Sequence, residues 1–309
     1  MGETIDILMA VYNGERYVQE QVESILRQTY RNWRLIIQDD GSTDGTVSRL
    51  QPYVQAYPKR VFLYQRKENS GAAHLNFYSM LPLSSARYVM FCDHDDVWMP
   101  DKIERTWQEM KRLEKGRKGL PCLVHTDLQV VGEDLSLVAP SMIQRQKLNP
   151  YASFRQIMVQ NAATGCTMMV NRPLLEMVGQ PPEQSIMHDW WFALIAAAFG
   201  KIGYVDRPTI LYRQHGDNQV GAKDAGSLSY NMERLKDQKG ARRVLYDTCI
   251  QAGEFLERYG KLLSPRQKEW LTAYRDLPKH GKAGRLYLLF RYRFWKKGIL
   301  RKLGQMAFI

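Results

Sequence analysis

Short apolar segments alternate with segments of helical periodicity through the first third of the chain. The apolar segments predict buried strands, at residues 5–12, 33–38, 61–64 and 88–92. Between the first two, Val18, Val22 and Ile25 repeat at helical spacing, and Pro100 is typical of the first turn of a later helix. Strands that alternate with helices in this way form a mostly parallel sheet with helices on its faces. The alternation therefore predicts an α/β fold.

Three polar clusters directly follow predicted strands. They are Tyr12–Asn13, Asp39–Asp40 and Asp93–Asp96. In parallel sheets of this kind, ligands bind beyond the carboxyl ends of the strands. The placement of all three clusters predicts a ligand site at that edge.

The second half of the chain is more mixed. Strands are expected at residues 123–131, 162–170, 202–205 and 210–212, and a helix rich in Trp and Ala at 188–199. From residue 228 onward the pattern is helical, with a break near Leu277–Pro278.

The acidic turn at Asp93, Asp95 and Asp96 is the strongest candidate for a metal site. Carboxylates this close repel one another unless a cation neutralises them, and Mg²⁺ and Mn²⁺ prefer oxygen ligands and often bind substrate phosphates. The alternative is a helix N-cap, but a cap needs one Asp and this turn has three. We therefore expect a divalent cation here.

Three other polar clusters remain ambiguous from the residues alone. Asp40 lies either in a capping loop or in contact with a base or ribose. Asp189 precedes two tryptophans, so it is either a general base with a raised pKa or a helix cap beside core residues. His215 could join oxygen ligands on a metal and Arg213 could face phosphate, although a lone His is more often structural.

These clusters occur in the order found in one known family. The relevant segments are residues 10–13, 38–46, 92–98, 165–168, 188–191 and 212–215. The chain resembles the family 2 inverting glycosyltransferases of bacteria, which have the GT-A fold, from about residue 5 to about 221. It looks most like the branch that assembles surface polysaccharide and includes rhamnosyltransferases. The resemblance implies a Rossmann-like, mostly parallel sheet flanked by helices.

The resemblance also implies roles at the donor end of the site. Ala10 and Tyr12 would line the nucleobase pocket, and Asp40 would bond the base. Asn69 lies in a segment that resembles the donor-side loop, and Asp93 would lie near the ribose within the D-x-D motif. The donor would be a UDP- or dTDP-sugar, with dTDP-rhamnose as one candidate.

At the reacting end, the resemblance implies that Asp95 coordinates Mn²⁺ or Mg²⁺, with His215 as a further metal or diphosphate contact. Asp189 would deprotonate a hydroxyl of a lipid-linked or growing bacterial glycan. Many relatives have Glu-Asp where this chain has His188-Asp189. The Q-x-x-R-W motif of the processive synthases is absent, which favours the addition of a single sugar.

The net charge of +12 is confined to the C-terminal region. Residues 1–224 contain 25 basic and 25 acidic side chains, whereas residues 225–309 contain 19 and 7. We therefore expect a neutral glycosyltransferase domain at 1–224 and a basic helical extension at 225–309.

If residues 288–306 form one helix, its apolar stripe includes Tyr292, Trp295 and Ile299 opposite basic residues. Such a helix is typical of attachment to an anionic membrane, and the alternative is a helix packed on the body.

Other sequence features favour the cytoplasm, at the inner face of the bacterial plasma membrane. The four cysteines show no metal or disulfide spacing, and neither a signal peptide nor a membrane-spanning segment is recognisable.

Two other functions remain as alternatives. A sugar-1-phosphate nucleotidyltransferase would require a Gly-rich basic loop where residues 12–15 contain one Gly. A non-catalytic protein binding membrane or nucleic acid would leave the acidic turns unexplained, and no nucleic-acid motif is present.

Overall fold

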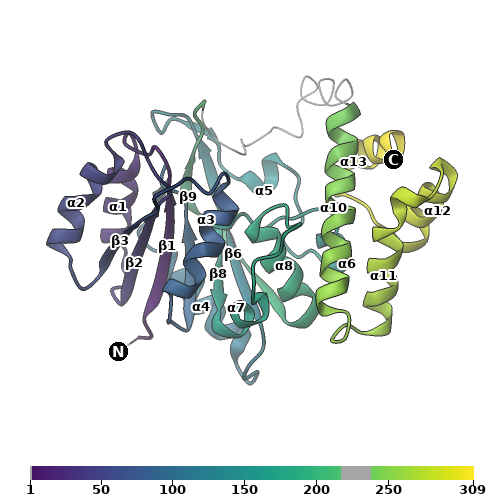
Figure 1. The fold of residues 1–309 in the computed structure, drawn as a ribbon, viewed down its shortest axis with the longest axis horizontal. Coiled ribbons are helices and arrows are strands. Elements are labelled where there is room, and N and C mark those ends of the chain that lie inside the picture. Colours follow the sequence, from purple (N-terminus) through teal and green to yellow (C-terminus); the bar gives the residue numbers. More distant parts are fainter. Residues whose placement is uncertain (1, 217–237) are drawn as a thin grey trace.

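A twisted sheet forms the centre of the computed structural model, which describes residues 2–216 and 238–309 (Figure 1). The strands are β1 (Ile5–Val11), β2 (Trp33–Asp39), β3 (Val61–Gln65), β4 (Tyr88–Cys92), β5 (Val97–Trp98), β6 (Cys122–Val131), β7 (Leu137–Ala139), β8 (Met169–Asn171) and β9 (Lys201–Arg213). Their order is β3-β2-β1-β4-β8-β6-β9-β5, with β7 paired to β6. Neighbours among β1–β4 are parallel, as are β6 and β9, whereas β8 is antiparallel to both β4 and β6.

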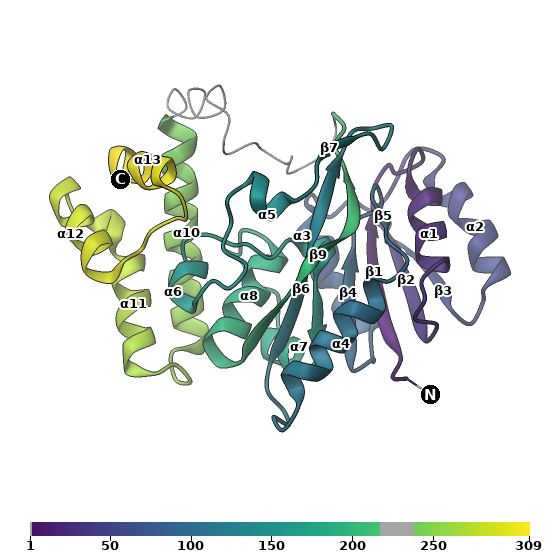
Figure 2. The ribbon, with the colours of Figure 1, turned by 180° about the vertical axis from the view of Figure 1, so that it is seen from behind.

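Helices cover both faces of this sheet (Figures 1 and 2). The helices of the described residues are α1 (Val18–Leu26), α2 (Thr46–Ala56), α3 (Ala73–Met80), α4 (Lys102–Glu114), α5 (Met142–Arg145), α6 (Phe154–Ile157), α7 (Arg172–Val178), α8 (His188–Phe199), α10 (Gln238–Tyr259), α11 (Pro265–Arg275), α12 (Lys282–Tyr292) and α13 (Ile299–Phe308). Helices α1 and α4 lie on one face, and α3, α7 and α8 lie on the other. The mostly parallel sheet between helical layers confirms the predicted fold class.

Strand β1 shows why its sequence is apolar at nearly every position. Ile7 and Met9 belong to the same buried cluster as Val22 of α1, whereas Leu8 belongs to the cluster of Phe77 on α3. A strand buried on both faces has no solvent-exposed side, so it lacks the alternation of polar and apolar residues.

The expected strands in the second half are only partly correct. Of residues 162–170, just the end enters β8, after a turn of 3-10 helix at Gly165–Thr167. The two short strands expected around Pro208 form one strand, β9. The register with β6 shifts between Thr126 and Asp127, and Asp127 pairs with Pro208. Such an irregularity accommodates a proline, which has no amide hydrogen for the ladder.

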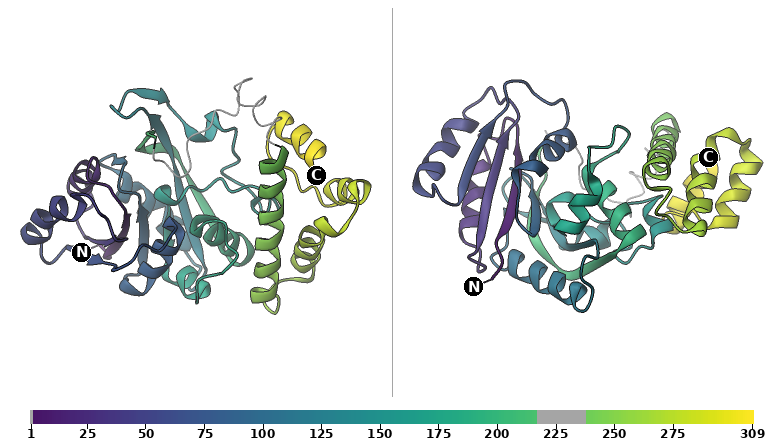
Figure 3. Two further views of the ribbon diagram at one scale, coloured as in Figure 1. Left: turned by 45° about the horizontal axis from the view of Figure 1, so that its top comes forward. Right: turned by 60° about the horizontal axis from the view of Figure 1, so that its bottom comes forward.

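The C-terminal region is helical, as expected, but its apolar stripe does not form on one helix. Helix α12 ends at Tyr292, because the next residue, Arg293, has a φ of 55°, and α13 begins only at Ile299. Phe255 of α10 and Phe294 share a buried cluster with Trp191 of α8, so these helices pack against the body (Figure 3). No helix within the described residues is long and apolar enough to cross a membrane. The expected domain boundary at residues 224 and 225 lies outside the described residues.

Candidate active site

The polar clusters meet at one edge of the sheet, as their positions predicted. The parallel register pairs Val11 of β1 with Asp39 of β2, and Met9 with Cys92 of β4. The residues that follow these strand ends therefore emerge side by side. Here, the loops at residues 12–15 and 41–46 are joined by hydrogen bonds, among them one from the amide of Thr43 to Asn13 Oδ1 at 2.9 Å.

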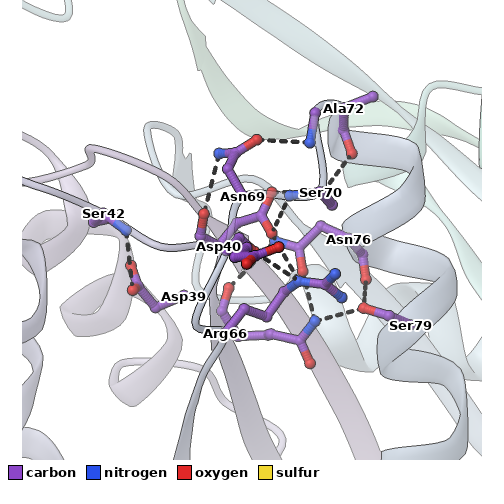
Figure 4. Close-up of polar contacts among 12 residues, drawn as sticks. Asp39, Asp40, Ser42, Arg66, Asn69, Ser70, Ala72, Asn76 and Ser79 are labelled. Carbon is purple, nitrogen blue, oxygen red and sulfur yellow. Dashed lines mark hydrogen bonds and ion pairs between the residues drawn. The ribbon is translucent and has the colours of Figure 1, made fainter.

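Asp40 holds the adjacent loop in place (Figure 4). Its Oδ1 accepts from the amide of Ser70 at 3.0 Å and lies 3.1 Å from Arg66 Nε, and its Oδ2 accepts from Ser70 Oγ at 2.6 Å. Asn69 Nδ2 donates to the carbonyl of Asp40 at 3.0 Å. The predicted residues Asp40 and Asn69 are thus brought together. In this arrangement the Asp40 carboxylate is already occupied by protein partners, which the sequence did not indicate.

The other predicted base-pocket residues lie at the end of β1. Ala10 is 8% exposed, whereas the side chain of Tyr12 is 47% exposed and accessible to a ligand. The sequence indicated no separate role for Asp39. In the structure Asp39 is 2% exposed, and its Oδ2 accepts a hydrogen bond from the amide of Ser42. Its Oδ1 has no hydrogen-bond partner among the described residues. Asp39 is therefore a second acidic candidate for contact with the donor, and its position beside Asp40 at the strand end was the available signal.

The D-x-D turn and the end of β9 lie together. His215 Nε2 is 2.8 Å from Asp95 Oδ2, so two residues 120 positions apart and predicted to share a metal are neighbours. Tyr17 packs against the imidazole with ring centroids 4.9 Å apart.

One interpretation of the sequence had the Arg213 side chain facing a phosphate. In the structure this side chain points into the protein instead. Its side chain is 4% exposed and donates to the carbonyl of Asp95 at 2.9 Å and to the carboxylate of Glu20. Its amide donates to Asp96 Oδ1 at 3.1 Å. Arg213 thus joins the D-x-D turn to β9.

The acidic turn holds several carboxyl groups close together in buried surroundings. Burial, followed by the charges of Asp95 and Asp189, raises the pKa of Asp93 to about 7. Burial and the charges of Asp95 and Asp93 raise the pKa of Asp96, whose Oδ2 lacks a partner among the described residues. Neighbouring carboxylates beside an imidazole fit a hard divalent cation.

A second group of possible ligand atoms lies deeper. Asp93, Asp96 and Cys166 bring one atom each within 4.8 Å of one another. Burial raises the pKa of the Cys166 thiol well above its usual value, which disfavours the thiolate that binds metals. The Asp95–His215 pair is therefore the better candidate.

Asp189 lies in the first turn of α8, close enough to raise the pKa of Asp93. Burial raises the pKa of Asp189 to about 6, although the amide of Gly165, which donates to Asp189 Oδ2 at 3.0 Å, opposes this shift. A Cβ at residue 165 would lie 2.9 Å from His188 Nε2, so only glycine permits this close approach. A half-buried carboxylate with this pKa can accept a proton near neutral pH.

The chain is similar in sequence and in fold to known glycosyltransferases. Residues 6–117 match the model of "Glycosyl transferase family 2". Over 248 residues the chain is 29% identical to the dTDP-rhamnosyl transferase RfbG of Shigella flexneri, covering 76% of this chain and 81% of the relative. Over 192 residues it is 26% identical to WfgD of Escherichia coli, a UDP-Glc:alpha-D-GlcNAc-diphosphoundecaprenol beta-1,3-glucosyltransferase, covering 62% and 69%.

A solved structure shares the fold. The mannosyltransferase PcManGT from Pyrobaculum calidifontis, in complex with GDP-Man and Mn²⁺, superposes with a TM-score of 0.53 at 16% identity. The match covers 98% of this chain and 82% of that one. Residues 6–117 therefore form a family 2 glycosyltransferase domain, and the chain shares its fold with a solved glycosyltransferase.

Proposed function

We propose that this glycosyltransferase depends on a divalent metal and transfers one sugar, with inversion, to a hydroxyl of a lipid-linked or growing bacterial surface glycan. The observation that carries this proposal is that Asp95, with His215 beside it, and Asp189 both lie close to Asp93 at one edge of the sheet. A UDP- or dTDP-sugar is the donor. The Shigella relative favours dTDP-rhamnose, and the Escherichia relative favours a lipid diphosphate acceptor.

The donor end of the site would bind the nucleotide. Ala10 and the exposed ring of Tyr12 line the base pocket, and Asp93 lies towards the ribose. Asp40 and Asn69 act at the base through the loop that they hold, and the unpartnered oxygen of Asp39 supports an additional contact there.

Asp95 and His215 would hold Mn²⁺ or Mg²⁺. A divalent cation bound there would neutralise the diphosphate and so make it a better leaving group. Arg213 supports this role because it fixes the main chain beside Asp95.

Asp189 would act as the general base. The acceptor oxygen forms a bond to the anomeric carbon as the bond from that carbon to the diphosphate oxygen breaks. The nucleoside diphosphate leaves with the bonding electrons, and the hydroxyl proton passes to Asp189. Attack from the face opposite the leaving group inverts the anomeric configuration. A pKa of about 6 leaves Asp189 mostly ionised at neutral pH yet basic enough to assist.

The basic extension, residues 225–309, would attach the glycosyltransferase domain, residues 1–224, to the inner face of the plasma membrane, where lipid-linked acceptors are found. Tyr287 and Phe290 on α12 are 64% and 61% exposed, and Ile299 at the start of α13 is 77% exposed. Between them, Arg291 and Arg293 are also exposed. Exposed apolar side chains beside basic ones suit an anionic lipid surface. Flotation of Phe290→Ser/Ile299→Ser with anionic vesicles tests this attachment, and binding equal to that of the unchanged protein would refute it.

The first experiment on the activity is a thermal shift with UDP or dTDP, with and without Mn²⁺. Stabilisation that requires both nucleotide and metal supports the proposal, whereas stabilisation by nucleotide that is the same without metal contradicts metal dependence. Mass spectrometry of reactions with a panel of nucleotide sugars then identifies the donor.

A further inference from the structure

The connection between α7 and α8, residues 179–187, leads directly to Asp189 and contains no helix or strand. Its backbone groups therefore need hydrogen-bond partners from elsewhere. Three residues before Asp189, the amide of Ile186 donates to Gln251 Oε1 of α10 at 2.9 Å. Gln251 is 1% exposed, so this bond is shielded from water.

Helix α10 holds the start of the same connection. Glu254 Oε1 accepts from the amide of Glu183 at 3.0 Å, and Oε2 accepts from the amide of Gln184. Arg258 donates to the carbonyls of Val178 and Gln180. Side chains from three successive turns of α10 thus bind the main chain of this connection.

The same helix also packs against the first turn of α8. Trp191, two residues after Asp189, is fully buried, with its ring centroid 5.3 Å from Phe255 and 6.1 Å from Tyr259. Tyr259 Oη donates to the carbonyl of Met177 at 2.8 Å. The segment that carries Asp189 is therefore fixed by α10 on both sides of that residue.

We propose that α10 positions the general base, with Gln251 and Glu254 as positioning residues. This inference depends on the role proposed for Asp189. The first part of the C-terminal region is then a component of the catalytic unit as well as a possible membrane attachment. An error of about 1 Å in the position of a catalytic group can reduce the rate by about a hundredfold, so precise support of Asp189 matters for turnover.

The test compares Gln251→Met, which removes the acceptor at nearly constant size, with Gln251→Glu, which keeps an acceptor oxygen. Thr248→Val is the matched control, because Thr248 is buried on α10 and bonds Tyr274 of α11 at 3.0 Å. We expect kcat to fall about tenfold in Gln251→Met, a loss of about 1.4 kcal/mol, with donor KM unchanged. Gln251→Glu should recover most of the loss, and Glu254→Ala should resemble Gln251→Met.

A kcat in Gln251→Met equal to that of Thr248→Val would refute the positioning role. So would a loss of kcat that only follows the fall in melting temperature across these four variants. Asp189→Asn, measured in parallel, separates this inference from the proposed function. If Asp189→Asn remains fully active, the assignment of the base is wrong. If it is inactive while Gln251→Met matches the control, only the role of α10 is wrong.

Discussion

Substituting Gly165 by alanine perturbs the proposed base without changing its carboxylate. The new Cβ would lie 2.9 Å from His188 Nε2 and 3.2 Å from His188 Cε1. The imidazole cannot easily retreat, because it is 2% exposed and packs on Phe77 and Phe91 with centroids 4.3 and 5.3 Å away. Residue 165 must therefore shift, which weakens the 3.0 Å hydrogen bond from its amide to Asp189.

The size of the effect follows from that hydrogen bond. A hydrogen bond to a charged group contributes about 1.5–3 kcal/mol. One pKa unit corresponds to about 1.4 kcal/mol, so complete loss of the bond raises the pKa of Asp189 by about one to two units. The amide stabilises the ionised form, so its loss raises the pKa. The acidic limb of the kcat profile should therefore move from about pH 6 to about pH 7–8.

The assay is the pH dependence of kcat for sugar transfer at saturating donor. Gly281→Ala is the control, because no atom lies within 4 Å of a Cβ at that position. We expect its profile to match that of the unchanged protein. An acidic limb that stays near pH 6 in a folded Gly165→Ala variant would refute the role of this amide.

Three further substitutions test other parts of the site and fold. Arg34→Met removes the guanidinium that binds fully buried Asp6 at 2.8 Å, so the free energy of unfolding in urea should fall by about 3 kcal/mol, and an unchanged value would contradict this. Asp95→Ala should abolish the Mn²⁺-dependent part of the thermal shift with dTDP or UDP, whereas a full shift would exclude Asp95 as a ligand. Arg66→Met removes the ion pair to Asp40, worth about 1 kcal/mol, and should raise donor KM about fivefold with little change in kcat. A donor KM that stays constant would show that this pair does not support the donor loop.

The sequence predicted the part of the site that depends on strand ends. Asp40 and Asp93 directly follow apolar strands, and parallel strands end at one edge, so the local pattern was sufficient to place both residues at that edge. The pairing of Asp95 with His215 was implied only by the family resemblance, because the two residues are 120 positions apart.

Other features depend on tertiary contacts that no local pattern records. The direction of the Arg213 side chain is decided by its hydrogen bonds to the Glu20 carboxylate and to the carbonyl of Asp95, both far away in the sequence. The prediction of one apolar stripe along a single helix was wrong, because Arg293 adopts a left-handed conformation that ends α12. No local pattern in the sequence marked Gln251 as a positioning residue, because its hydrogen-bond partner Ile186 is 65 residues away.

The most direct test of the central claim is the comparison of binding and transfer in Asp189→Asn. The amide keeps the shape of the carboxylate and an acceptor for Gly165, but it cannot take the acceptor proton at neutral pH. We predict that the variant binds dTDP or UDP with Mn²⁺ as tightly as the unchanged protein. Sugar transfer should fall by about a thousandfold. Transfer at the unchanged rate with normal nucleotide binding would contradict Asp189 as the base and, with it, the proposed mechanism.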